Sequence, residues 1–92
     1  MASKYIVAVN IESSQEIISF ANYLKSLGYG WWHKVGTCWV ITPIGNVSLG
    51  DMRDLAHIYF PNSRLIVIEM IDAHWTGWGS DSDFSWFHTN WD

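Results

Sequence analysis

Residues 30–42, GWWHKVGTCWVIT, constrain the fold of this chain more than any other stretch. Gly36-Thr37 fits a two-residue turn, because glycine reaches the positive φ that such turns need. The turn predicts a β-hairpin in which Val35 faces Cys38. One face then carries Trp31, His33, Val35, Cys38 and Val40, and the other carries Trp32, Lys34, Trp39 and Ile41. A hairpin with one wet side alternates apolar and polar residues. Both of these faces are largely apolar, so we expect both to be covered.

The segments around the hairpin predict two further strands and two helices. Residues 5–11 and 64–71 are short β-branched runs without a polar face. Residues 13–27 begin with the capping-box pair Ser13 and Glu16, residues 48–59 have Asp51 in their first turn, and both carry an apolar stripe at helical spacing. The order strand, helix, strand, strand, helix, strand predicts a ferredoxin-like α/β sandwich of the α+β class, a four-stranded antiparallel sheet with two helices on one face.

The other face of this sheet would expose Ile, Val or Trp from every strand, which is too large an apolar patch to leave in water. A homodimer packed sheet to sheet is the simplest cover, and a tail folded over the sheet is the second. We expect residues 1–72 to form the ferredoxin-like domain and residues 73–92 an acidic aromatic extension. Because disordered tails are poor in aromatic residues, the extension is expected to dock on its own or a partner subunit. The docking side chains would be Trp75, Trp78, Phe84, Trp86 and Phe87.

Composition argues against several functions. Nine acidic residues against five Lys and Arg give a net charge of −4, which argues against direct binding of nucleic acid through phosphates. Cys38 is the single cysteine and fits a small buried hydrophobe rather than a disulfide. The sequence contains no cleavable signal and no membrane-length apolar run, which predicts a cytoplasmic protein without a membrane partner.

Four segments together resemble a known group of proteins: the hairpin WWHKVGTCWVIT, the helix with Met52-Arg53-Asp54, the strand RLIVIEM and the Trp-x-Gly-Trp segment 75–78. They resemble small bacterial and phage proteins of the SinR family, which is distinct from the helix-turn-helix repressor of that name. That family is similar in fold to the smaller CRISPR adaptation subunit and to VapD-type ribonucleases. The resemblance spans residues 4–80 and is most specific in the hairpin. It implies a homodimer whose C-terminal strand can join the partner's sheet, a host-cytoplasmic location if phage-encoded, and a role against host defence.

The same resemblance bears on catalysis. The adaptation subunits and ribonucleases carry an aspartate at the end of the first strand, and two such aspartates in a dimer can share a divalent metal for phosphodiester cleavage. Asn10 stands at the matching position, and an amide is a poor Mg²⁺ ligand and no base. Glu12 could substitute, although a lone acid at a strand end is usually solvated. These are weak catalytic candidates, and we expect no metal or cofactor except Mg²⁺ under a nuclease reading.

Aromatic and acidic side chains supply the candidate binding residues. Trp31, Trp32 and Trp39 fit the core or a dimer interface, or a pocket in which a nucleotide stacks. His33 fits a partly buried histidine bonded to the backbone, or a polar contact in an aromatic pocket. The acids of the tail fit a solvated run, or a negative surface for a basic partner. The tail candidates are Trp75, Trp78, Asp81, Asp83 and Trp86.

Three functions stay open at this point. The first is a non-enzymatic homodimeric interaction protein that binds or inhibits a host nucleic-acid-processing or defence complex through its acidic aromatic tail. The second is a metal-dependent nuclease that uses Glu12 near the dimer axis. The third is a nucleotide-binding or sequestering protein with tryptophan stacking. Asn10 and the acidic balance favour the first, with a protein as the partner.

Overall fold

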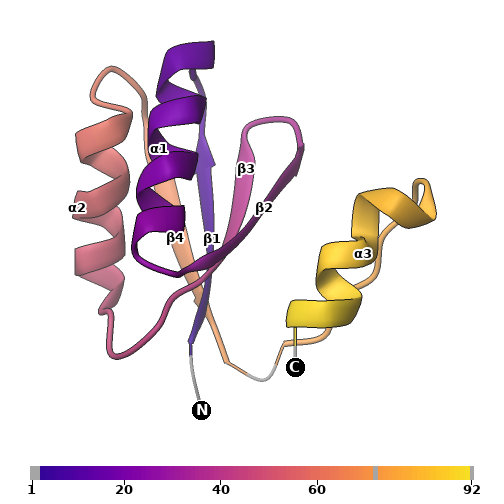
Figure 1. Ribbon diagram of the computed structural model, residues 1–92. Helices are drawn as coiled ribbons and strands as arrows, with labels where there is room; N and C mark the ends of the chain where they lie inside the picture. Colours follow the sequence, from indigo (N-terminus) through magenta and orange to yellow (C-terminus); the bar gives the residue numbers. More distant parts are fainter. Residues whose placement is uncertain (1–2, 72, 92) are drawn as a thin grey trace.

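The computed structural model describes residues 3–71 and 73–91 of the chain. It is an α+β fold with a four-stranded antiparallel sheet of strand order β2-β3-β1-β4 (Figure 1), which confirms the predicted ferredoxin-like sandwich. The elements are β1 (Lys4–Val9), α1 (Ser14–Ser26), β2 (Gly30–Val35), β3 (Cys38–Thr42), α2 (Leu49–Tyr59), β4 (Leu65–Met70) and α3 (Asp81–Asn90). No helix in the described ranges is long and apolar enough to cross a membrane.

Helices α1 and α2 cover one face of the sheet. Both begin as the sequence predicts: Ser13 accepts from the backbone N–H of Glu16 at 3.1 Å, and Ser48 accepts from that of Asp51 at 3.0 Å. The hydroxyl and carboxylate of each pair satisfy N–H groups that an isolated helix leaves without partners. The main core lies beneath these helices. Its buried residues are Tyr5, Val7, Val9, Phe20, Leu24, Trp39, Ile41, Met52, Ala56 and Phe60.

The hairpin departs from its predicted register. Gly36 has a φ of +50° and Val35 pairs with Cys38 as expected, but Trp32 pairs with Val40. His33 and Lys34 therefore both lie opposite Trp39, which is a β-bulge. The extra residue reverses the alternation, so the predicted assignment of faces is wrong. Three of the side chains concerned, Trp31, His33 and Trp39, pack together on the side of α1 and α2.

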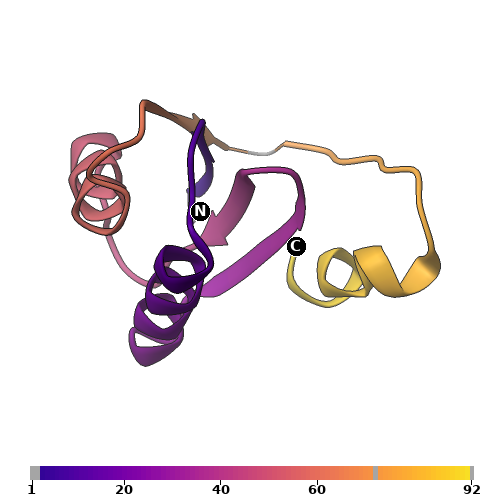
Figure 2. The same cartoon turned by 90° about the horizontal axis from the view of Figure 1, so that it is seen from above.

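The tail forms a third helix, α3, that the sequence analysis does not predict. It lies on the opposite side of the sheet from α1 and α2, beside β2 (Figure 2). Its aromatic side chains build a second apolar cluster, which we call the tail cluster. The buried members are Trp32, Val40, Phe87 and Trp91, and the partly buried ones are Ile6, Met70, Ala73, Trp75, Phe84 and Trp86. A folded tail, the second of the two predicted covers, therefore occupies part of this face.

The tail cluster joins the two predicted parts of the chain. Trp32 from β2 donates its indole N–H to the backbone oxygen of Asp83 in α3 at 2.7 Å. Gly30 permits the approach of the helix, since a Cβ there would lie 3.2 Å from the Trp86 ring. The predicted boundary itself, residue 72, lies outside the described residues. A homodimer packed sheet to sheet stays a prediction for the part of the face that α3 leaves uncovered.

Candidate functional site

Glu12, which lies between β1 and α1, has a largely buried side chain. Its side chain is 7% exposed and that of His33 is 10% exposed. Glu12 Oε1 lies 2.8 Å from His33 Nε2, and Glu12 Oε2 accepts from Trp39 Nε1 at 3.0 Å. The expectation of a solvated acid is therefore wrong, because these two ring nitrogens replace water as partners of the carboxylate.

The partner of the second ring nitrogen of His33 shows which nitrogen carries a hydrogen. His33 Nδ1 lies 2.8 Å from the backbone oxygen of Cys38, and a carbonyl oxygen only accepts, so Nδ1 carries a hydrogen. The contact between Nε2 and Glu12 then requires one further proton shared by imidazole and carboxylate. The imidazole also stacks on the Trp39 indole with ring centroids 4.0 Å apart. This geometry confirms the backbone-bonded histidine, and each ring nitrogen of His33 and each carboxylate oxygen of Glu12 has a partner within the chain.

Asn10, directly after β1, has a structural role in which its side chain accepts hydrogen bonds from residues directly before β4. Its Oδ1 accepts from the backbone N–H of Arg64 at 2.7 Å and from the Ser63 hydroxyl at 2.8 Å. These bonds tie the end of β1 to the start of β4, and they occupy the atom with which an asparagine would bind a metal. Within residues 3–71 and 73–91, no group of three or more His, Cys, Asp or Glu side chains is placed to hold a metal ion.

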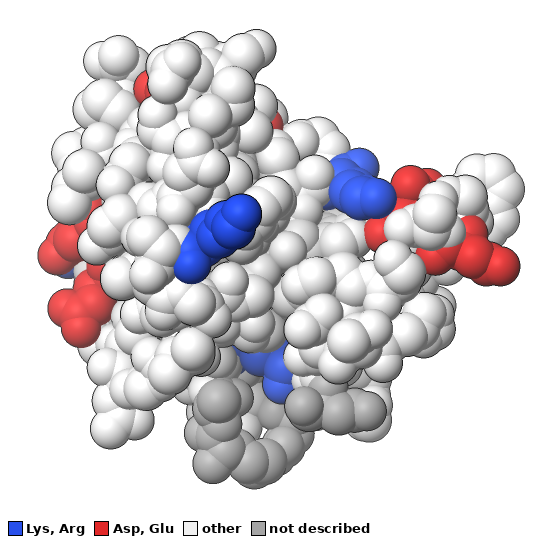
Figure 3. Space-filling view, in the orientation of Figure 1, with Lys and Arg blue, Asp and Glu red and all other residues white. Residues whose placement is uncertain are grey.

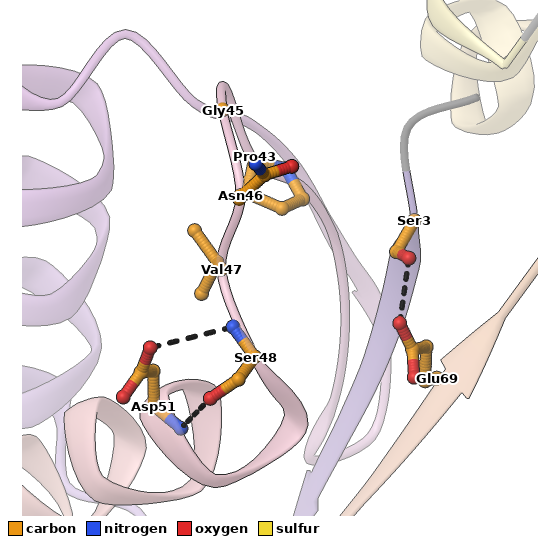
Figure 4. Close-up of a pocket in the computed structure, with 8 residues that line it drawn as sticks. All are labelled: Ser3, Pro43, Gly45, Asn46, Val47, Ser48, Asp51 and Glu69. Atoms are coloured by element: carbon orange, nitrogen blue, oxygen red, sulfur yellow. Dashed lines mark hydrogen bonds between the residues drawn. The ribbon is translucent and has the colours of Figure 1, made fainter.

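A pocket of about 320 Å³ opens beside the N-terminal end of α2 (Figure 4). It is lined by Ser3, Pro43, Gly45, Asn46, Val47, Ser48, Asp51 and Glu69. Both acids already have partners: Asp51 caps α2, and Glu69 accepts from the Ser3 hydroxyl at 2.6 Å. No aromatic side chain is among these lining residues, so the pocket offers no surface on which a nucleotide base would stack.

Tyr5 connects this pocket to the main core. Its buried hydroxyl donates to the backbone oxygen of Val47, and burial, followed by the charge of Glu69, raises the pKa of Tyr5 above its usual value of 10.0. Folding therefore favours the neutral phenol. The resulting stabilisation is complete below about pH 10 and is lost as the pH rises through the raised pKa.

Tyr5→Phe should therefore change stability in two ways. At neutral pH the lost hydrogen bond is expected to cost about 1 kcal/mol. Above pH 10.0, the usual pKa of the phenol, the free energy of unfolding should fall less steeply than in the wild type. Urea denaturation across this pH range measures both effects, with Tyr23→Phe on α1 as the control. Equal alkaline slopes for the wild type and Tyr5→Phe would contradict the assignment.

The predicted tryptophans separate into three environments. Trp31 and Trp39 belong to the main core. Those of the tail cluster are Trp32, Trp75 and Trp86. Trp75, Phe84, Trp86 and Phe87 pack in the tail cluster. Trp78 is 99% exposed, so it does not dock on its own chain, and its docking on a partner subunit stays a prediction.

Phe84 holds the loop that carries Trp78. Its ring lies 5.8 Å from Trp32 and 5.9 Å from Trp75, stacked on both. The glycines on either side of Trp78 contact the same ring: a Cβ on Gly77 would overlap it, and a Cβ on Gly79 would lie 3.0 Å from Phe84 Cε2. The loop backbone thus packs on a partly buried phenylalanine, while the indole between the two glycines is exposed to water.

Acidic side chains gather at the end of the molecule that carries this loop (Figure 3). Asp81 is exposed at the start of α3. The Asp83 carboxylate accepts from the backbone N–H of Ser80 at 3.2 Å. Hydrogen bonds from the Ser80 side chain and backbone lower the pKa of Asp83. The loop before α3 and the first turn of this helix therefore combine an exposed indole with a carboxylate held in its charged form.

No family model, curated protein or solved structure matches the chain. The resemblance to the SinR family stays a prediction, as do the homodimer and the phage and defence setting that it implies. Function is therefore inferred from the geometry described above. In the described part of the chain, only two of the candidate residues have no partners that hold the fold together. These are Trp78, on the loop before α3, and Asp81, at the start of α3.

Proposed function

We propose that this protein is a non-enzymatic interaction protein that binds a protein partner through Trp78 and the acidic start of α3. The exposure of Trp78, 99% on a loop seated against Phe84, is the observation that carries the proposal. Tryptophan is enriched among the few residues that dominate binding energies. An indole that adds nothing to the packing of its own chain is explained by a partner that buries it.

The loop is suited to binding because it is already ordered. Gly77 and Gly79 pack on the Phe84 ring, so binding would freeze few additional rotamers, and this lowers the entropic cost of association. Asp81 and Asp83 place negative charge beside the indole. The partner is therefore expected to offer an apolar pocket with Lys or Arg at its rim. Such basic surfaces bind nucleic acid in nucleic-acid-processing complexes, which supports inhibition by occupation of that surface.

The two alternatives receive less support from the site. A nuclease would need oxygen ligands for a metal, but Asn10 Oδ1 already accepts two hydrogen bonds. Each carboxylate oxygen of Glu12 already has one partner, His33 or Trp39. Nucleotide stacking would need exposed rings, but Trp39 is fully buried. Trp78 could stack on a base, although the acids nearby would repel the phosphate.

Trp78→Ala is expected to leave the free energy of unfolding within about 0.5 kcal/mol of the wild type and to weaken partner binding by about 2 kcal/mol, roughly thirtyfold. A photo-crosslinking amino acid at position 78 would capture the partner in cells of the source organism. The purified pair is then titrated with the wild type and with Trp78→Ala.

The matched control is Ile58→Ala, which removes another exposed apolar side chain, 70% exposed on α2. It should bind as the wild type does. Asp81→Lys should also weaken binding, because it places a positive charge against the basic rim. Unchanged affinity of Trp78→Ala, or equal losses in Trp78→Ala and Ile58→Ala, would contradict the proposal.

A further inference from the structure

We infer that β4 pairs edge to edge with β4 of a second copy, so that two four-stranded sheets become one continuous sheet across a two-fold axis. This inference goes beyond the proposed function, since it uses neither Trp78 nor α3. It also differs from packing of two sheets face to face. The strand order β2-β3-β1-β4 places the two edges of the sheet at β2 and β4.

The edge at β2 is protected against further pairing. The bulge between Trp32 and Val35 interrupts its ladder, Lys34 stands on the strand, and α3 packs beside it. A bulge, a lysine and a covering element are the devices by which natural proteins block edge strands.

The edge at β4 has none of these devices among the described residues. It pairs with β1 in unbroken register from Leu65 to Met70, and its sequence LIVIEM contains no proline or lysine. In the described ranges, β1 is its only strand neighbour. A regular, apolar edge of this kind is a template for another strand. The contrast with β2 indicates that the free edge of β4 pairs with another strand.

Exposed isoleucines mark the same strand. Ile66 is 59% exposed and Ile68 is 48% exposed, on the face of the sheet where α3 lies beside β2 (Figure 2). Two copies of one strand related by a two-fold axis pair antiparallel, and opposite residues must share a face. With Val67 on the axis, Ile66 of each copy lies opposite Ile68 of the other. Apolar cross-strand pairs of this kind stabilise a sheet.

Charge complementarity selects a second copy as the occupant. In this register the second copy's Glu69 lies opposite Leu65. Leu65 lines a groove of about 300 Å³ with Arg53 of α2. In the single chain Arg53 pairs only with its exposed neighbour Asp54 among the described residues, and Glu69 is exposed. Each copy would therefore bring its Glu69 towards Arg53 of the other, and the symmetry makes this contact twice.

Light scattering on the full chain tests the dimer. The wild type is expected to have twice the chain mass of 10.6 kDa. The double variant Ile66→Lys, Ile68→Lys should be monomeric, because it brings four ammonium groups together at the axis. The control, Ile18→Lys with Ile58→Lys, changes two exposed isoleucines on the helices, 54% and 70% exposed, and should stay dimeric. A monomeric wild type, or a dimer that survives the β4 double variant, would overturn the inference.

Two further experiments, a charge exchange and a disulfide crosslink, test the register. Arg53→Glu and Glu69→Arg should each weaken the dimer about tenfold, and their combination should restore it. In a Cys38→Ser background, Ile66→Cys and Ile68→Cys should form a disulfide when mixed but not alone, since opposite residues lie within disulfide reach. Crosslinking of either variant with itself, or no rescue by the charge exchange, would place the copies in another arrangement and refute edge pairing about Val67.

Discussion

Replacing Glu12 with alanine is expected to lower the free energy of unfolding by about 3 kcal/mol. The change removes the carboxylate that His33 Nε2 and Trp39 Nε1 both contact. It leaves Nε2 of a 10% exposed imidazole without a partner and a buried indole N–H without an acceptor. A buried donor without a partner costs its full desolvation free energy, which explains why the loss exceeds that of an ordinary hydrogen bond.

Glu12→Gln separates the charge from the hydrogen bonds. The glutamine oxygen can accept from Trp39 Nε1, and the amide can donate to a neutral His33, because Nδ1 already carries the hydrogen that faces the Cys38 carbonyl. The expected loss is therefore smaller, about 1 kcal/mol. Urea denaturation measures both variants, with the exposed acid change Asp54→Ala as the control. If Glu12→Ala cost no more than Asp54→Ala, Glu12 would not be buried in this cluster.

Phe87→Ala is expected to detach the tail from the sheet. The Phe87 ring lies at the centre of the tail cluster, 4.9 Å from Trp32, 4.6 Å from Trp75 and 5.3 Å from Trp91. Removing a buried phenylalanine costs about 3–5 kcal/mol. Because the main core beneath α1 and α2 shares no buried residue with the tail cluster, the loss should fall first on α3.

Limited proteolysis combined with mass spectrometry measures this local opening. In Phe87→Ala, cleavage within residues 73–80 should become rapid while the four-stranded sheet stays protected, because opening of the tail no longer requires global unfolding. Trp78→Ala serves as the control, since it changes an exposed tryptophan in the same segment. Equal cleavage rates in the wild type and Phe87→Ala would show that the tail cluster does not hold α3.

Much of the fold could be predicted from local patterns. The capping pair Ser13 and Glu16 and the turn at Gly36 act over a few residues, and the structure contains both. The same kind of signal was present for α3: Ser80 and Asp83 have capping-box spacing, and Asp83 accepts from the Ser80 backbone. The sequence does not predict α3 because its aromatic residues do not form a clear apolar stripe at helical spacing, although the signal for the start of a helix is present.

The remaining differences arise from contacts distant in sequence. Glu12 gave no sign of burial, because its partners His33 and Trp39 follow 21 and 27 residues later. The bulge between Trp32 and Val35 adds one residue to β2, and a strict two-residue alternation does not anticipate it. In the sequence, nothing distinguishes Trp78 from the tail tryptophans that dock. Only the seating of Gly77 and Gly79 on Phe84 separates it from them.

Hydrogen exchange of the indole N–H groups tests most directly whether the tail is docked on the sheet and whether Trp78 stays exposed to solvent. Trp32, Trp39 and Trp91 donate to Asp83, Glu12 and Ala73 at 2.7, 3.0 and 2.8 Å. Their NMR signals, assigned with Trp→Phe variants, should exchange slowly, and the Trp78 signal should exchange at the rate of a free indole. Exchange of the Trp32 signal as fast as that of Trp78 would contradict the docked tail. Protection of Trp78 in the isolated protein would contradict its display.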